Sequence, residues 1–192
     1  MKTKFKVNPP SSSLRQGYDR QARLRMTGKK TGEVVVAVSG GFDPIHIGHI
    51  RMFREAKALG DRLVVILNND NWLINKKGYA FMPEKERVEV IKAIEGVDDV
   101  LLTHHPKNFT DRSVCAELTE LKPDIFANGG DRKPDGDPVP EVALCQELGI
   151  EMLYSIGWGG KVQSSSWLTV ASRIKCKCGG ELTCKNKCLP EC

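Results

Sequence analysis

Two histidines, His46 and His49, follow a short apolar run at residues 34–38 and a pair of glycines, Gly40 and Gly41. The apolar run predicts a buried strand, and the glycines predict a turn that delivers both histidines onto the first turn of a helix. At this spacing the two rings share one helix face. A helix start also offers unpaired backbone N–H groups and the positive end of the helix dipole, which favour an anion. The pattern therefore predicts a phosphate site with two titratable hydrogen-bond donors.

Three other kinds of site fit the glycine and histidine patterns less well. A zinc-protease helix needs histidines four apart with a glutamate between them, and neither condition is met. The glycines near the histidines do not have the G-x-G-x-x-G spacing of a dinucleotide-binding loop. In the later glycine-rich loop, Gly160 and Lys161 are followed by Val162 rather than by Ser or Thr, so a Walker phosphate loop is excluded as well.

The segment at 40–49 resembles the HxGH signature of the cytidylyltransferase-like nucleotidyltransferase superfamily, because residues 46–49 spell His-Ile-Gly-His. The resemblance spans about residues 33–172 and is greatest to the glycerol-3-phosphate cytidylyltransferase and heptose 1-phosphate adenylyltransferase types. It implies an enzyme that transfers CMP or AMP from CTP or ATP to a phosphorylated sugar or polyol and releases pyrophosphate. In such an enzyme His46 and His49 would donate hydrogen bonds to the phosphates, and Mg²⁺ would accompany the triphosphate.

The resemblance also assigns further residues to the site. Lys77 and Arg87 would bridge the acceptor phosphate and the transferring phosphoryl group, because a lysine supplies a point charge and an arginine a fork that matches phosphate oxygens. Lys76 and Asp70 would lie beside them on the acceptor side. Nucleotide contacts are expected from the glycine turn and from two later segments, at Gly40, Gly41, Phe42, Asp43, Gly48, Gly130, Asp131, Arg132, Ser164, Ser165 and Ser166.

Strands and helices are expected to alternate along the chain. Apolar runs predict five strands, at 34–38, 63–67, 100–102, 125–127 and 152–154. Helices with one apolar face are expected at 48–59, 83–95, 114–121 and 141–148, with a last helix opening at 167, whereas residues 68–78 are expected to form a loop. The alternation predicts a Rossmann-like α/β fold, the nucleotidylyl transferase fold, in which a five-stranded parallel sheet has helices on both faces. Ligands of such sheets bind beyond the carboxyl ends of the strands, where the motifs above lie.

Charge and cysteine content divide the chain into three parts. Residues 1–32 hold nine Lys/Arg and one Asp, and are expected to form a flexible basic arm. Residues 33–174 are expected to form the nucleotidyltransferase domain, and residues 175–192 a cysteine-rich tail. The tail has five cysteines that are candidate zinc ligands, although their spacing leaves redox chemistry or a disordered tail open: Cys176, Cys178, Cys184, Cys188 and Cys192.

The expected partners are a nucleoside triphosphate and a small phosphorylated acceptor. Nucleic acid is not expected, because few aromatic residues accompany the basic ones. No stretch is apolar enough to span a membrane and no secretory signal is recognisable, so a cytoplasmic location is expected. The choice between ATP and CTP stays open, and so does the choice between a monomer and a homodimer. Two alternative functions also stay open, a nicotinamide-mononucleotide-type adenylyltransferase and a non-catalytic relative that binds nucleotide or RNA.

Overall fold

A computed structural model describes residues 30–129, 140–157 and 163–171 of the protein. The described residues form one five-stranded sheet in the order β3-β2-β1-β4-β5, with all neighbouring strands parallel. The strands are β1 (Val35–Gly40), β2 (Arg62–Leu67), β3 (Asp99–Leu102), β4 (Ile125–Gly129) and β5 (Glu151–Ile156). The predicted five-stranded parallel α/β fold is confirmed.

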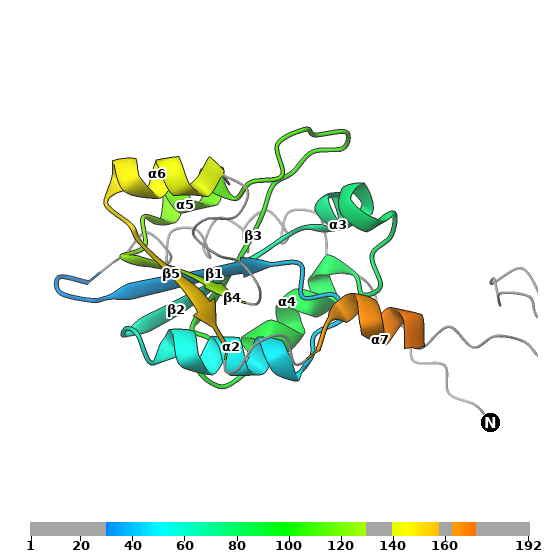
Figure 1. Ribbon diagram of the computed structural model, residues 1–192, viewed down its shortest axis with the longest axis horizontal. Helices are drawn as coiled ribbons and strands as arrows, with labels where there is room; N and C mark the ends of the chain where they lie inside the picture. The colour runs from blue at the N-terminus through cyan, green and yellow to red at the C-terminus, as the bar shows by residue number, and fades with distance from the viewer. Residues whose placement is uncertain (1–29, 130–139, 158–162, 172–192) are drawn as a thin grey trace, which may run out of the picture.

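Helices cover both faces of this sheet (Figure 1). One face carries α5 (Cys115–Leu121) and α6 (Pro140–Leu148), and the other carries α2 (Ile47–Lys57) and α4 (Glu84–Lys92). Two further helices, α3 (Asp70–Lys77) and α7 (Ser165–Ala171), lie toward the carboxyl end of β1. No helix among the described residues is long and apolar enough to cross a membrane.

The sheet is buried on both faces because its central strands are apolar at most positions, with Ser39 and Gly40 in β1 and Arg62 in β2 as the exceptions. In β1, Val35 and Ala37 pack under α5 and α6, whereas Val36 and Val38 pack under α2 and α4. This alternation follows from the two-residue repeat of a strand. All six residues of β2 are buried. Continuous apolar strands of this kind are typical of parallel sheets with helices on both sides.

The direction in which the chain adds strands to the sheet reverses at β1. This strand pairs with β2 on one side and with β4 on the other, so the chain runs to one edge of the sheet and then returns to build the other. At such a switch point the loops that follow neighbouring strands diverge and leave room for a ligand. The glycine turn and the histidine pair follow β1 here, so the fold brings the predicted phosphate site to the expected place.

The predicted loop at 68–78 is wrong, because α3 occupies most of it. Asn69 caps this helix by accepting the N–H of Trp72 at 3.0 Å, and Gly78 ends it with a φ of 85° that favours glycine. Its sequence is mainly polar and shows no apolar face, so periodicity alone does not reveal it. As a result, Lys76 and Lys77 lie in the last turn of a helix rather than at the tip of a loop.

Candidate active site

The two histidines stack on each other where β1 leads into α2. His46 is the N-cap residue of α2 and His49 is the third residue of the helix. Their ring centroids are 3.7 Å apart and their planes differ by 21°. The Nδ1 atom of His46 accepts the N–H of Gly48 at 3.2 Å, and that of His49 accepts the N–H of His46 at 3.2 Å. Because both Nδ1 atoms accept hydrogens, the proton of each neutral ring lies on Nε2, where it can be donated to a ligand.

Both rings are held in the neutral form. Burial lowers the pKa of His46 below its ordinary value. Burial, reinforced by the neighbouring His46, lowers the pKa of His49 to about 3. Two imidazolium rings would repel each other at this distance, whereas two neutral rings can stack. At neutral pH the pair therefore offers two adjacent Nε2–H donors and no positive charge.

Phe42 and Gly48 shape the space around the rings. Phe42 has a φ of 47°, is 4% exposed, and meets the ring of His49 edge-on at a centroid distance of 4.9 Å. A Cβ atom on Gly48 would lie only 3.0 Å from Cε1 of His46. The N–H of Gly48 is already bonded to His46. The missing side chain of Gly48 thus makes room for the His46 ring.

The two glycines of the turn are required by close packing. A Cβ on Gly40 would lie 2.9 Å from the ring of Phe42, and one on Gly41 would lie 2.7 Å from Cδ2 of Leu73 in α3. Both distances are shorter than carbon–carbon contact allows. Gly40 and Gly41 therefore let the turn pack tightly against Phe42 and α3.

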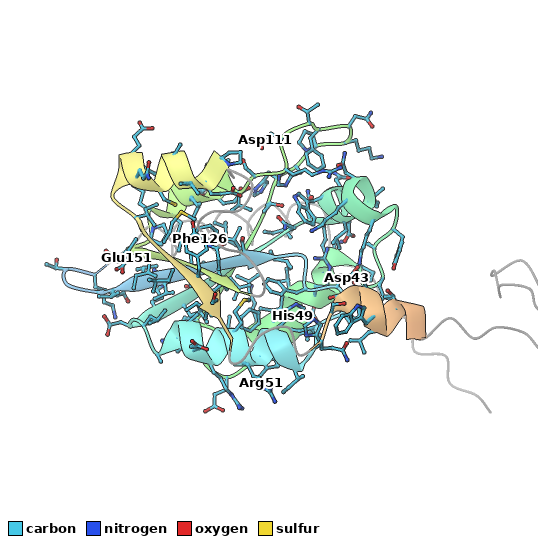
Figure 2. All side chains as sticks on the ribbon, in the orientation of Figure 1. Asp43, His49, Arg51, Asp111, Phe126 and Glu151 are labelled. Carbon is cyan, nitrogen blue, oxygen red and sulfur yellow. The ribbon has the colours of Figure 1, made fainter. Side chains whose placement is uncertain are left out.

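Asp43 lies beneath the site and not on its surface. Its side chain has no exposed area. The carboxylate accepts the N–H groups of Phe81 and Met82 and the ammonium of Lys77, each at 2.7 Å. The expected contact between Asp43 and a nucleotide is corrected accordingly, because the buried carboxylate is enclosed by protein donors. Figure 2 shows Asp43 and His49 at the end of the sheet where α2 begins and α7 lies.

Arg87 is also buried, at 1% exposure, where a contact with the acceptor phosphate was expected. Its guanidinium donates to the main-chain oxygens of Met82 at 2.9 Å, Gly41 at 2.8 Å and Asn68 at 2.7 Å. It also donates to Oδ1 of Asp70 at 2.6 Å. Four of the five N–H donors of an arginine are therefore used inside the protein. The structure corrects the expectation: Arg87 ties α4 to the glycine turn, to β2 and to α3.

Lys77 lies beside the buried carboxylate, with its side chain 24% exposed. Its Nζ donates to the main-chain oxygen of Asp43 at 2.8 Å and to Oδ2 at 2.7 Å. An ammonium has three hydrogens, so one remains after these two bonds. Lys76 is separated from this contact, since its Nζ lies 4.7 Å from the ring centroid of Trp72.

The serine segment comes to the same loop. Ser165 donates its hydroxyl hydrogen to the main-chain oxygen of Pro44 at 2.8 Å, which docks the start of α7 beside the histidine turn. Ser164 caps α7 by accepting the N–H of Trp167 at 3.1 Å, and Ser166 is exposed. The structure therefore brings the three serines close to the loop that carries the histidines, although two hydroxyls already have partners in the protein.

A set of amide side chains that the sequence analysis did not single out fixes α3 in place. Asn69 and Asn71 both donate to the main-chain oxygen of His105, at 2.8 and 2.9 Å. The indole N–H of Trp72 donates to the oxygen of Arg112 at 2.9 Å. These bonds fasten α3 to the loop between β3 and α5. The asparagine-rich sequence after β2 was the available signal, because asparagine favours helix caps and bonds to nearby backbone.

Several predicted site residues lie outside the described part of the chain. These are Gly130, Asp131, Arg132 and the tail cysteines Cys176, Cys178, Cys184, Cys188 and Cys192, together with residues 1–29 of the basic arm. Their assignments stay predictions. Within 30–129, 140–157 and 163–171, no group of three or more His, Cys, Asp or Glu residues is arranged to hold a metal ion.

Comparison with known proteins places the chain in a family. The cytidylyltransferase-like family matches residues 37–145. The "Bifunctional protein HldE" of Koribacter versatilis is 32% identical over 137 residues, which are 70% of this chain and 24% of that relative. The chain thus spans about a quarter of the length of the HldE proteins it matches. The "FAD synthase" of Pyrococcus horikoshii is 34% identical over 122 residues, 63% of this chain and 79% of the relative.

A solved structure agrees with these relatives. The lipopolysaccharide core biosynthesis protein from Thermoplasma volcanium GSS1 has a TM-score of 0.55 and 28% identity, and the alignment covers 67% of this chain and 100% of that one. The family match extends over more than half of the present chain and includes the stacked histidine pair. The protein therefore belongs to the cytidylyltransferase-like family of nucleotidyltransferases.

Proposed function

We propose that the protein transfers a nucleotidyl group from a nucleoside triphosphate to the phosphate of a small acceptor. An oxygen of the acceptor phosphate forms a bond to the α-phosphorus, and the bond from that phosphorus to the bridging oxygen breaks, so that pyrophosphate leaves. The acceptor phosphate is already ionised at neutral pH, so the reaction needs no general base. The single observation that carries the proposal is the stacked pair of His46 and His49, with both Nδ1 atoms bonded to the backbone.

The histidine pair suits this reaction because it donates hydrogen bonds without needing to move. Negative charge builds up on the transferring phosphoryl group and on the departing pyrophosphate. Donors that are already aimed at these oxygens lower the barrier, since they do not have to reorganise during the reaction. The backbone bonds to both Nδ1 atoms fix the rings and their tautomers. Each Nε2–H would bind a phosphate oxygen.

Lys77 would contact the attacking acceptor phosphate, and the start of α7 would contact the leaving group. The remaining hydrogen of the Lys77 ammonium would meet the acceptor phosphate and offset its repulsion from the triphosphate. The helix start at residues 164–166 would hold the leaving pyrophosphate. Mg²⁺ would enter with the triphosphate and keep several waters. The Asp43 carboxylate does not fit as a metal ligand, because two main-chain N–H groups and Lys77 already occupy it.

A sugar or polyol phosphate is the first candidate acceptor, and ATP the first candidate donor. The HldE matches support the sugar phosphate. The FAD synthase match supports a second candidate, flavin mononucleotide, because that relative is covered over 79% of its length. It also favours ATP, since the formation of FAD from flavin mononucleotide adds an adenylyl group. Nicotinamide mononucleotide stays a third candidate.

A crossed substrate screen tests the proposal. ATP and CTP are each combined with glycerol 3-phosphate, heptose 1-phosphate, phosphocholine, flavin mononucleotide and nicotinamide mononucleotide, and pyrophosphate release is measured. We expect the highest kcat/KM with ATP and a sugar or polyol phosphate. Arg54→Ala, an exposed change on the same helix as His49, serves as the control and should react as the wild type does. Nucleotide binding without pyrophosphate release from any pair would refute the proposal and favour a non-catalytic relative.

A further inference from the structure

Lys77 is held more firmly than a surface lysine. A lysine side chain is long and flexible, so its ammonium ordinarily samples many positions. Here two oxygens of one residue, Asp43, accept from the same Nζ at 2.8 and 2.7 Å. The ring of Tyr79 lies on another side, with its centroid 4.8 Å from Nζ. These contacts fix the ammonium and leave one hydrogen for a ligand.

Asp43 is itself fixed from two directions. Its buried carboxylate accepts the N–H groups of Phe81 and Met82, each at 2.7 Å. These two residues lie in the segment that leads into α4. Its backbone belongs to the turn that carries His46 three residues later. The same carboxylate therefore sets the position of the Lys77 ammonium relative to the histidine pair.

We propose that Asp43 is a positioning residue for nucleotidyl transfer, which holds the Lys77 ammonium in place for the acceptor phosphate without touching either substrate. This inference rests on the function proposed above and names the residue through which its acceptor site is built. A charge that is fixed before the substrates arrive stabilises the transition state without first being ordered. Loss of Asp43 should therefore act on the acceptor through Lys77 and leave nucleotide binding unchanged.

The protein contains a matched control at the opposite end of the sheet. Lys57 donates to Oδ2 of Asp98 at 2.7 Å, and Asp98 also accepts the N–H of Leu63 at 2.7 Å. This pair has the same chemistry as Lys77 and Asp43, a lysine on a carboxylate that also binds the main chain. It lies at the amino end of β2 rather than at the carboxyl ends of the strands. Asp98→Asn therefore makes the same chemical change away from the site.

Chemical labelling tests the contact without any substrate. Lysine amines are acetylated with acetic anhydride, and the rate at each position is measured by mass spectrometry. Lys77 of the wild type should react more slowly than Lys85, an exposed lysine of α4. Asp43→Asn should raise the rate at Lys77 by about tenfold, the factor expected for one lost charge-assisted hydrogen bond, and Asp98→Asn should not change it. Equal rates at Lys77 and Lys85 in the wild type would overturn the inference even if Asp43→Asn failed to fold.

A double-mutant cycle tests the role in transfer. With the acceptor found in the screen, Lys77→Met should lower kcat/KM on the order of a hundredfold. Asp43→Asn should lower it at least tenfold and leave the nucleotide Kd unchanged. The double variant should lie within about a factor of two of Lys77→Met, because Asp43 acts through Lys77. Losses that multiply, or a nucleotide Kd that rises with Asp43→Asn, would overturn the inference. A wild type without turnover would refute the proposed function alone, because the labelling still decides whether Asp43 holds Lys77.

Discussion

Replacing Gly48 by alanine should separate catalysis from stability at the histidine pair. The added methyl group would lie 3.0 Å from Cε1 and 3.1 Å from Nδ1 of His46. Carbon atoms prefer separations of about 3.5–4.0 Å, so the ring must shift by roughly half an ångström. This shift tilts the ring away from His49 and weakens its bond to the N–H of residue 48. One of the two Nε2–H donors then loses its alignment.

We expect Gly48→Ala to leave the free energy of unfolding nearly unchanged and to lower kcat strongly. Alanine is favoured over glycine inside a helix by about 0.8–1 kcal/mol, whereas a weakened N-cap costs about 1 kcal/mol. These contributions nearly cancel, so Gly48→Ala should leave the free energy of unfolding within about 1 kcal/mol of the wild type. Misalignment of one preorganised donor should lower kcat on the order of a hundredfold.

The assay combines urea unfolding with pyrophosphate release, and His46→Ala supplies the control background. Without the His46 ring there is nothing for the methyl group to displace. The double variant His46→Ala/Gly48→Ala should therefore turn over at the same rate as His46→Ala. Full activity of Gly48→Ala would show that turnover does not depend on the position of the His46 ring. An equal loss of activity from Gly48→Ala in the wild type and in His46→Ala would show that the added methyl group does not act through the His46 ring.

Further predictions concern pH and the buried arginine. Because the pKa of His49 is lowered from 6.5 to about 3, the unfolded chain binds a proton that the native protein excludes between these values. The free energy of unfolding should thus fall as the pH drops from 6.5 toward 3, and His49→Asn should weaken this dependence in urea titrations. Arg87→Lys should lower the free energy of unfolding by about 3–5 kcal/mol, because it leaves buried carbonyls and Asp70 without their partner. Unchanged stability with a raised KM for the acceptor would instead indicate a direct substrate contact.

The sheet could be predicted closely from the sequence because its strands are nearly continuous apolar runs. The apolar run at 63–67 predicts the second strand, and the observed β2 (Arg62–Leu67) is one residue longer. The helix α3 escaped prediction because polar residues on all its sides give no periodic signal. Its ends were nevertheless encoded, since Asn69 has a side chain that caps helices and Gly78 the freedom to adopt a positive φ. The order of the strands depends on long-range pairing and could not be derived from local patterns.

The candidate site could be predicted where its residues directly follow a strand or lie at the start of a helix. The histidine turn and the serines at 164–166 meet as predicted, because both lie at the carboxyl end of the sheet. Asp43 was misassigned because its partners, Phe81 and Met82, are 38 and 39 residues away in the chain. For Arg87 a local signal existed, since it precedes the buried Ile91 by four residues and so shares its inner helix face. The family resemblance indicates a phosphate contact at this position instead, and it takes no account of the burial of Arg87.

The most direct test of the account follows the α-phosphorus of the nucleotide. ATP carrying a label at the α-phosphorus is mixed with the preferred acceptor and with wild-type, His46→Ala or His49→Ala protein. The proposed transfer mechanism predicts that the label passes to the acceptor as a nucleotidyl group while unlabelled pyrophosphate is released, and that each histidine variant slows this transfer on the order of a hundredfold. Transfer of the γ-phosphoryl group instead, or undiminished transfer by both histidine variants, would contradict it.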